Sequence, residues 1–281
     1  MKYLRPATIP EFLAGLSDHP GARILAGATD VVPQGRKSGQ FPAILIDPGA
    51  IRDQFEGIRT EGGWLWIGAF TPFQEIVDDP RLNRDYRVLA EAARWIGSRQ
   101  IRNMATVGGN IANASPAGDS MPALLVYEAS LRCRGLSGAR ELPLAEFYLG
   151  YKQTALRAGE FIEAVLLPPP PTVRKDYYRK AGPRRVLSIS RTALAGLVEG
   201  GPGTALACRL AAAGVAPVPV RLRNVEALLQ SGFPHIPDEQ GRESLAAALR
   251  DDIAPITDLR GSAEYKFQVT LNFISEMIEE L

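Results

Sequence analysis

Two short glycine-containing loops carry the residues best suited to binding an anionic ligand. The first, Leu25–Asp30, overlaps the end of the apolar run Arg23–Ala26, and the second begins at Thr106 and continues to Asp119. Each loop combines glycines, which leave backbone N–H groups unobstructed, with hydroxyls that can donate to an anion. This combination predicts a phosphate or pyrophosphate site. A glycine-rich turn alone is also typical of an ordinary tight turn, so the loops do not by themselves name a ligand.

The familiar nucleotide and hydrolase motifs are missing from the sequence. There is no P-loop, and Gly201–Gly203 begins like a dinucleotide fingerprint but has Leu206 where the third glycine belongs. No Gly-x-Ser-x-Gly elbow occurs either. The sequence therefore argues against a Rossmann site and against serine hydrolase chemistry.

The composition is that of a soluble globular protein of one or two domains. The 281 residues are 46% hydrophobic and 22% charged, and 32 basic residues against 31 acidic ones give a net charge of +1. A nucleic-acid partner usually requires a basic excess. No apolar run reaches membrane-spanning length, and Met1–Pro6 lacks the apolar core of a secretion signal. We expect a cytoplasmic protein with no membrane span and no nucleic-acid partner.

Cysteine and histidine are too few and too scattered for a metal centre. Cys133 and Cys208 cannot supply the ligands of an iron–sulfur cluster or a cysteine-rich zinc site. His19 and His235 fit no metal spacing. We therefore predict that the chain has no metal site of its own.

The elements that must position these loops alternate between strands and helices. Apolar runs predict strands at Arg23–Ala26, Ala43–Ile46, Trp64–Ala69, Leu124–Arg134, Glu160–Leu167, Arg191–Glu199 and Leu206–Val215. Helical spacing and start signals predict helices after Thr8 and Thr71 and over Tyr86–Ile96, Val225–Leu229, Leu245–Leu249 and Ser262–Leu281. Thr71 is the predicted cap of its helix, with Pro72 at the first helical position. Four prolines at Pro168–Pro171 predict a domain boundary. In the last helix, we expect Tyr265, Val269, Phe273 and Met277 to pack on a sheet.

The two loops resemble those of the FAD-binding subunits of the molybdenum hydroxylases. Ala26–Val31 is similar to the family's Ala-Gly-Gly-Thr-Asp-Leu loop, with Ala28 replacing the second glycine. Thr106–Ile111 is similar to its Thr-Val-Gly-Gly-Asn-Ile loop, which here continues to Ala114–Pro116 and Asp119. Further similar segments follow in the family's order along the chain: Phe147–Leu156, which looks like the Gly-Tyr-Arg-Lys-Thr segment of the xanthine dehydrogenase branch, then Arg179–Ala181, Ser188–Ser190, Gly214–Pro217 and Arg260–Tyr265.

The resemblance implies an α+β fold. Residues 1–170 would form the two-subdomain, PCMH-like FAD-binding fold of the family, with subdomains at about 1–55 and 56–170. A smaller α+β domain would follow over residues 171–281.

The resemblance also implies a non-covalent FAD site, with no catalytic residue and no metal ligand on this chain. Its residues would be Leu25, Ala26, Gly27, Ala28, Thr29, Asp30 and Val31 in the first loop, Thr106, Gly108, Gly109, Asn110, Ser115 and Asp119 in the second, Ile96 and Ile162 against the flavin rings, and Lys180 near their pyrimidine edge. By pattern alone, Ile96 and Ile162 are ordinary core residues and Lys180 is a surface lysine. Ala28 would cost about 1 kcal/mol or more if its φ is positive.

An electron-transfer function follows from the same resemblance. An iron–sulfur subunit and a molybdopterin-binding subunit would be partners, in a dimer of heterotrimers, and NAD or another small acceptor would take the electrons from the FAD. The branch would be xanthine dehydrogenase-like, with carbon monoxide, aldehyde and nicotinate dehydrogenases as alternatives. A flavin-free scaffold of the same fold and a stand-alone flavin oxidase are rival hypotheses. The oxidase would need a catalytic base near the flavin, and neither loop contains a histidine.

Overall fold

Four β-sheets with helices between them make up the part of the chain that the structure describes. The structure is a computed structural model and describes residues 1–184, 188–200, 207–231 and 239–280. Leu206, Leu281, His235 and the Gly201–Gly203 segment lie outside the described residues.

The N-terminal part is a small parallel sheet with two helices. Strands β1 (Lys2–Leu4), β2 (Arg23–Ile24) and β3 (Ile44–Ile46) lie in the order β1-β3-β2, with α1 (Ile9–Asp18) and α2 (Val31–Ser38) along the chain between them. The predicted start of α1 is confirmed, because the Thr8 side chain accepts a hydrogen bond from the backbone N–H of Glu11. Phe12 packs edge-on against Phe70 and Phe161 and so joins this part to the next sheet.

The middle part is an antiparallel sheet with short helices. Its strands lie in the order β4-β5-β10-β6-β7, and a short hairpin follows β7 in the chain. The strands are β4 (Ile58–Glu61), β5 (Trp64–Gly68), β6 (Ser130–Gly135), β7 (Gly138–Pro143) and β10 (Phe161–Leu167), with β8 (Tyr148–Gly150) and β9 (Gln153–Thr154) forming the hairpin. The helices are α3 (Phe73–Asp78), α4 (Pro80–Asp85), α5 (Arg87–Arg94), α6 (Arg99–Arg102), α7 (Val107–Ala112) and α8 (Ser120–Val126).

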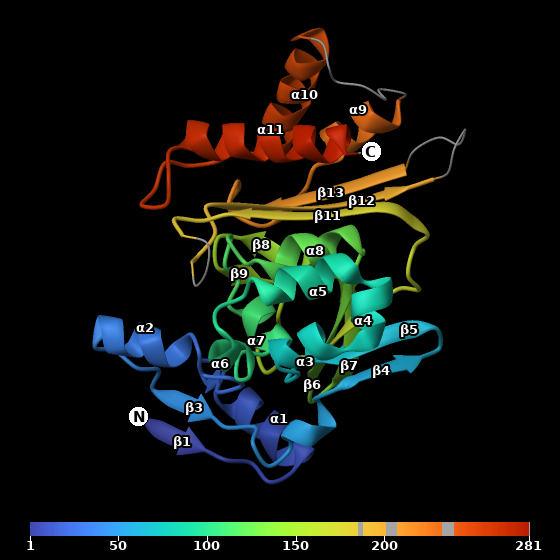
Figure 1. The fold of residues 1–281 in the computed structure, drawn as a ribbon. Coiled ribbons are helices and arrows are strands. Elements are labelled where there is room, and N and C mark those ends of the chain that lie inside the picture. Colours follow the sequence, from blue (N-terminus) through green and yellow to red (C-terminus); the bar gives the residue numbers. More distant parts are fainter. Residues whose placement is uncertain (185–187, 201–206, 232–238, 281) are drawn as a thin grey trace.

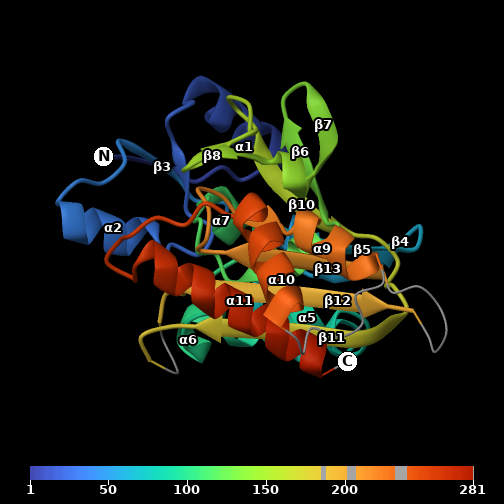
Figure 2. The same ribbon diagram turned by 90° about the horizontal axis from the view of Figure 1, so that it is seen from above.

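The C-terminal part is a second antiparallel sheet that is covered on both faces (Figures 1 and 2). Its strands β11 (Val173–Ala181), β12 (Thr192–Glu199), β13 (Ala207–Ala213) and β14 (Val220–Arg221) are followed by α9 (Arg223–Gln230), α10 (Glu239–Asp252) and α11 (Ala263–Glu279). Alternate residues of β12 belong to different cores: Ala193 and Ala195 pack with the middle part, and Leu194 and Val198 pack with the C-terminal helices. The sheet is therefore a wall shared by two cores. The division of the chain into domains at about residue 170 stays a prediction.

Two of the predicted local structures are wrong, and the side chains show why. Over Leu124–Arg134 the structure has the end of α8, a turn and then β6, because a short apolar run can be a buried helix as well as a strand. Thr71 does not cap α3, which begins at Phe73 after Pro72. Its hydroxyl instead donates to the carbonyl of Gly57 and accepts from the N–H of Gly57, so Thr71 joins two loops.

The predicted helix at the C-terminus is confirmed, but its buried face differs from the predicted one. Of the four residues expected to pack on the sheet, Met277 is fully buried, whereas Tyr265 is exposed. Lys266 and Thr270 are also buried on α11. The Nζ of Lys266 lies 2.9 Å from Asp258 and donates to the carbonyl of Ile256, and the Thr270 hydroxyl lies 3.0 Å from that of Thr192. Because Lys266 and Thr270 are buried with hydrogen-bond partners, the buried face of α11 includes polar residues. The spacing of apolar residues alone therefore predicts the wrong face.

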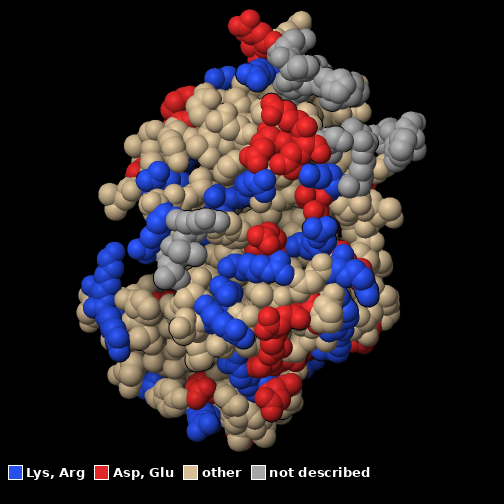
Figure 3. Space-filling view, viewed as in Figure 1, with Lys and Arg blue, Asp and Glu red and all other residues tan. Residues whose placement is uncertain are grey.

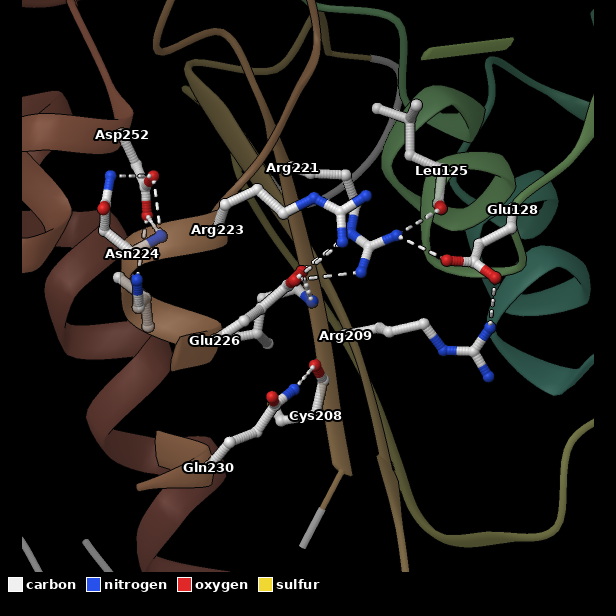
Figure 4. A network of polar contacts seen from close by, with 12 residues as sticks. Leu125, Glu128, Cys208, Arg209, Arg221, Arg223, Asn224, Glu226, Gln230 and Asp252 are labelled. Carbon is white, nitrogen blue, oxygen red and sulfur yellow. Dashed lines mark hydrogen bonds and ion pairs between the residues drawn. The ribbon is translucent and has the colours of Figure 1, made fainter. Parts of the chain in front are cut away.

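Helix α8 lies in the core between the middle part and the C-terminal sheet, and polar contacts hold its C-terminal end (Figure 4). Arg221 of β14 donates to the carbonyl of Leu125 at 3.3 Å and lies 3.5 Å from the Glu128 carboxylate, which also pairs with Arg209 at 3.4 Å. Arg221 is itself held by two parallel bonds to Glu226, of 2.7 and 3.0 Å, and both side chains are only 5–6% exposed. This buried pair therefore connects the C-terminal sheet to the end of α8.

Charged side chains also meet across the face where α5 approaches β11. Figure 3 shows basic and acidic residues interspersed there, and the ion pairs include Arg87–Asp176 and Arg179–Glu276. This face therefore has no large patch of purely positive or purely negative charge. Among the described residues, no helix is long and apolar enough to cross a membrane, and no group of three or more His, Cys, Asp and Glu is arranged to hold a metal ion.

The buried pair predicts a specific pattern of stability changes. We expect Arg221→Met to lower the free energy of unfolding by about 3–5 kcal/mol, because it leaves the Glu226 carboxylate buried without its partner. The double variant Arg221→Met/Glu226→Gln should regain most of this loss, since the neutral amide can still accept from the N–H of Leu210. Arg223→Met is the matched control, because Arg223 contacts the same carboxylate but its side chain is 64% exposed. Urea unfolding measures the stability of all three variants. An equal loss of stability in Arg221→Met and Arg223→Met would contradict the special role of the buried Arg221–Glu226 pair.

Candidate functional site

Both predicted loops line one cleft of about 830 Å³. The cleft also borders α2, the loop before β3 and the segment that leads into β10. The predicted site residues that line it are Ala26, Gly27, Ala28, Thr29, Asp30, Val31, Thr106, Gly108, Gly109, Asn110 and Ile162. The structure thus brings together two loops that are about 80 residues apart in the sequence.

The first loop presents a row of backbone N–H groups without partners. The N–H of Leu25 donates to Ile46 and that of Val32 donates to the carbonyl of Ala28. Between them, the N–H groups of Gly27, Ala28, Thr29 and Asp30 have no hydrogen-bond partner within the described part of the chain. Such a row of adjacent donors is a nest for an anion.

Close packing explains the glycine of this loop. A Cβ added to Gly27 would lie only 2.0 Å from the carbonyl oxygen of Met104. The loop can therefore approach the segment before α7 only because residue 27 has no side chain. Ala28, by contrast, adopts φ +58°, a left-handed conformation that strains an alanine.

The second loop differs from its predicted role as an amide cradle. The N–H of Val107 donates to Thr71, that of Gly108 to Ala69, and those of Gly109 and Asn110 to the hydroxyl and the carbonyl of Thr106. These four N–H groups are therefore not free to bind a ligand. The loop instead forms part of the cleft wall through its packed backbone and its polar side chains. The Asn110 side chain accepts a bond of 2.7 Å from Ser120, the first residue of α8. Gly108 is required for packing, since a Cβ there would lie 2.5 Å from that of Ala69.

Arg52 supports the first loop, although no sequence motif contains it. Its guanidinium donates to the carbonyl of Ala26 at 2.8 Å and to that of Phe70 at 2.9 Å, and it pairs with Glu56. Burial and the negative charge of Glu56 raise the pKa of nearby Glu75. Nothing in the sequence signals the contact with Ala26, because Arg52 lies 26 positions further along the chain.

The cleft carries an excess of uncompensated positive charge. Arg23, Lys152 and Arg157 line it, and none of the three side chains has a carboxylate within 4 Å among the described residues. Of the two acidic lining residues, Glu160 is paired with Arg140 at 2.8 Å, a hydrogen bond that lowers the pKa of Glu160, and Asp30 offsets one of the three positive charges. All three basic residues are exposed, so their net positive charge favours the approach of an anionic ligand.

Asp119 and Lys180 form a second cluster outside the lining of the cleft. The Nζ of Lys180 lies 2.5 Å from Asp119 Oδ2 and donates to the carbonyl of Trp95 at 3.2 Å, while the hydroxyl of Ser190 donates to the other carboxylate oxygen. Tyr178 donates to the carbonyl of Asp119 at 3.0 Å. The Lys180 side chain is only 3% exposed, so it is not a surface lysine. Burial raises the pKa of Asp119, and the charge of Lys180 opposes that shift.

Three other predicted residues also lie outside the lining of the cleft. Ile96, next to Trp95, packs against the same core cluster to which Ile162 belongs. Leu25 precedes the row of free N–H groups, and the hydroxyl of Ser115 accepts from the N–H of Ala117. None of these three residues is part of the cleft wall.

Comparison with known proteins identifies the family. Residues 1–170 match the sequence model described as the FAD binding domain in molybdopterin dehydrogenase, and residues 177–281 match that of the CO dehydrogenase flavoprotein C-terminal domain. The chain belongs to the family of FAD-binding subunits of the molybdenum hydroxylases. It is therefore a subunit of an FAD-dependent oxidoreductase, and FAD is its cofactor.

Individual relatives cover almost the whole chain. A putative xanthine dehydrogenase FAD-binding subunit of Escherichia coli (strain K12) is 30% identical over 99% of this chain and 94% of its own length. The carbon monoxide dehydrogenase medium chain of Afipia carboxidovorans is also 30% identical, over 99% of this chain and 95% of its own. The solved structure of carbon monoxide dehydrogenase from Hydrogenophaga pseudoflava aligns with a TM-score of 0.90 at 28% identity, covering 99% of this chain and 96% of that one. The predicted α+β fold of this family is confirmed.

The strain at Ala28 predicts a stabilising substitution. We expect Ala28→Gly to raise the free energy of unfolding by about 0.5–1 kcal/mol, because glycine adopts φ +58° without strain. Gly39→Ala is the opposite control: residue 39 has φ +70° with nothing within 4 Å of an added Cβ, so strain alone should lower the stability by about 1 kcal/mol. Denaturant unfolding measures both changes. A loss of stability in Ala28→Gly would contradict the left-handed conformation.

Proposed function

We propose that the chain binds FAD across the cleft and relays electrons in a xanthine dehydrogenase-like enzyme. The observation that carries this proposal is the row of free N–H groups at Gly27–Asp30, in the wall of a cleft with excess positive charge. That arrangement suits the diphosphate of FAD. When bound, the flavin supplies chemistry that joins one-electron and two-electron transfer.

The first loop, the two isoleucines and Lys180 keep their predicted roles within this proposal, whereas the second loop contributes wall and side chains in place of amide donors. Gly27–Asp30 donate to the diphosphate, and Gly109 and Asn110 form the adjoining part of the cleft wall. Ile162 and Ile96 pack against the flavin rings. Lys180 lies near their pyrimidine edge, where its ammonium group favours negative charge. The bond to Asp119 holds the Lys180 side chain in a fixed place inside the protein.

The protein partners are proposed from membership of this family. We propose that an iron–sulfur subunit delivers electrons and that a molybdopterin-binding subunit oxidises the substrate, in a dimer of heterotrimers. The described residues contain no cluster of metal ligands that could do either task. A cytoplasmic location belongs to the same proposal and is supported by Cys133 and Cys208, which are both buried and unpaired.

The choice of branch rests on one segment. The xanthine and carbon monoxide dehydrogenase relatives are both 30% identical to this chain, so overall identity does not separate them. Gly150–Thr154 resembles the xanthine dehydrogenase branch, and it forms the hairpin that places Lys152 at the cleft. The alternative is the medium subunit of a carbon monoxide, aldehyde or nicotinate dehydrogenase.

The packing of Gly27 gives a test of the cofactor site. We expect Gly27→Ala to raise the Kd for FAD at least about tenfold, because the new methyl group would clash with the Met104 carbonyl and displace the row of N–H donors. Gly21→Ala is the matched control, since a Cβ at that residue would meet nothing within 4 Å. Titration with FAD, followed by flavin fluorescence, measures both. Equal affinities for the two variants would remove the first loop from the site.

The electron acceptor can be tested separately. If NAD is the acceptor, NADH should reduce the FAD bound to the purified chain in the reverse direction, and the visible flavin absorbance should fall under anaerobic conditions. Dithionite provides the positive control for reducibility. Reduction by dithionite without reduction by NADH would contradict NAD as acceptor and leave the site intact.

A further inference from the structure

We propose that Lys152 is a phosphate-binding residue, whose ammonium group faces the N–H donors of Gly27–Asp30 across the diphosphate of the bound dinucleotide. This inference rests on the proposed FAD site and adds a residue to it. Lys152 is one of the lining residues of the cleft but is not among the residues expected from the sequence.

A short chain of hydrogen bonds connects Lys152 to the first loop. Its Nζ donates to the backbone carbonyl of Asn113 at 2.5 Å and lies 3.2 Å from the side-chain oxygen of that residue. The Asn113 amide in turn donates to the carboxylate of Asp30 at 2.9 Å. Asp30 is the last residue of the row of free N–H groups. Lys152 therefore lies beside the anion nest, at the point where the two loops meet.

The charge of Lys152 is not neutralised by its contacts. Both of its hydrogen-bond acceptors are uncharged oxygens, and within the described ranges no carboxylate lies within 4 Å of its Nζ. Partial desolvation lowers the pKa of Lys152, although the residue is exposed; Asp30 opposes this shift, and Arg23 and Arg260 add to it. The net effect disfavours the charged ammonium. A phosphate group would reverse that balance, because it supplies the missing negative charge.

The backbone at Lys152 adds an independent observation. Lys152 adopts φ +57° in the turn of the β8–β9 hairpin, a conformation that glycine takes freely and that strains a lysine. Strained residues are concentrated at binding sites, where the surrounding structure holds them in place. Of the four described non-glycine residues with positive φ, Ala28 and Lys152 line this cleft and Ala114 directly follows Asn113. The hairpin therefore holds Lys152 at the cleft in a strained conformation, as the proposal requires.

Binding of three ligands to the full chain tests this proposal. FAD contains the diphosphate and the flavin, ADP contains the diphosphate alone, and riboflavin contains the flavin without phosphate. We expect Lys152→Met to raise the Kd for FAD and for ADP by roughly tenfold to a hundredfold, as for the loss of a hydrogen bond to a charged group. The Kd for riboflavin should stay within about twofold of the wild-type value. Lys37→Met is the matched control, because this exposed lysine at the end of α2 does not line the cleft.

Lys152→Gly separates ligand binding from folding. Glycine removes the ammonium group and also relieves the strain at φ +57°, so this variant should melt at the same temperature as the wild type or higher, while its affinity for FAD and ADP falls as in Lys152→Met. Lys152→Arg should retain part of the affinity, because it keeps a positive charge at the same place.

The outcomes distinguish this inference from the function on which it rests. Wild-type protein that binds none of the three ligands would overturn the FAD site as a whole. Wild-type protein that binds FAD, together with unchanged FAD and ADP affinities in Lys152→Met and Lys152→Gly, would overturn the role of Lys152 alone. A loss of riboflavin affinity as large as that of ADP would also overturn it, because the substitution would then act on the flavin end of the site.

Discussion

The fixed position of α8 between the middle part and the C-terminal sheet is the constraint on which the rest of the structure depends. Every residue of this helix is buried, and each of its ends is held by side chains of the C-terminal part. Arg221 binds the carbonyl of Leu125 near its end, while Lys180 and Ser190 bind Asp119 just before its first residue. Ser120, the first residue of α8, then donates to Asn110 in the wall of the cleft. The C-terminal sheet therefore fixes the position of the cleft wall through α8. Of the residues in this sheet, only Lys180 of β11 is expected near the flavin.

Backbone strain and close packing occur together at the cleft and at the end of α8. Ala28 and Lys152 have left-handed backbones at the cleft, and Glu128 has one at the junction between α8 and Arg221. Conformations of this kind persist only where many contacts fix the chain. Gly27 and Gly108 have the complementary role, since a single methyl group at either residue would collide with backbone or with Ala69. The cleft thus depends on two loops that approach their neighbours more closely than side chains would allow.

The sequence predicts the two loops and the family well. It misses features that depend on contacts between distant segments of the chain. Gly27 and Gly108 stand out because loop motifs are local, and the strands around them are short apolar runs. The engaged amides of the second loop could not be foreseen, because two of their acceptors, Thr71 and Ala69, come from a distant segment. Arg52 and Lys152 escape prediction for the same reason: each acts through contacts with residues more than 25 positions away. Thr71 has the sequence of a helix cap, but its hydroxyl is used by Gly57 in the tertiary structure.

The most direct test of this account is the identity of the flavin that the chain retains. The purified protein, saturated with a mixture of FAD, FMN and riboflavin and then freed of unbound ligand, should show a visible flavin spectrum and release FAD alone on denaturation. That result would follow from a cleft whose N–H donors and cations select the diphosphate. Retention of FMN or riboflavin in preference to FAD would contradict the account, and so would a colourless protein that takes up none of the three.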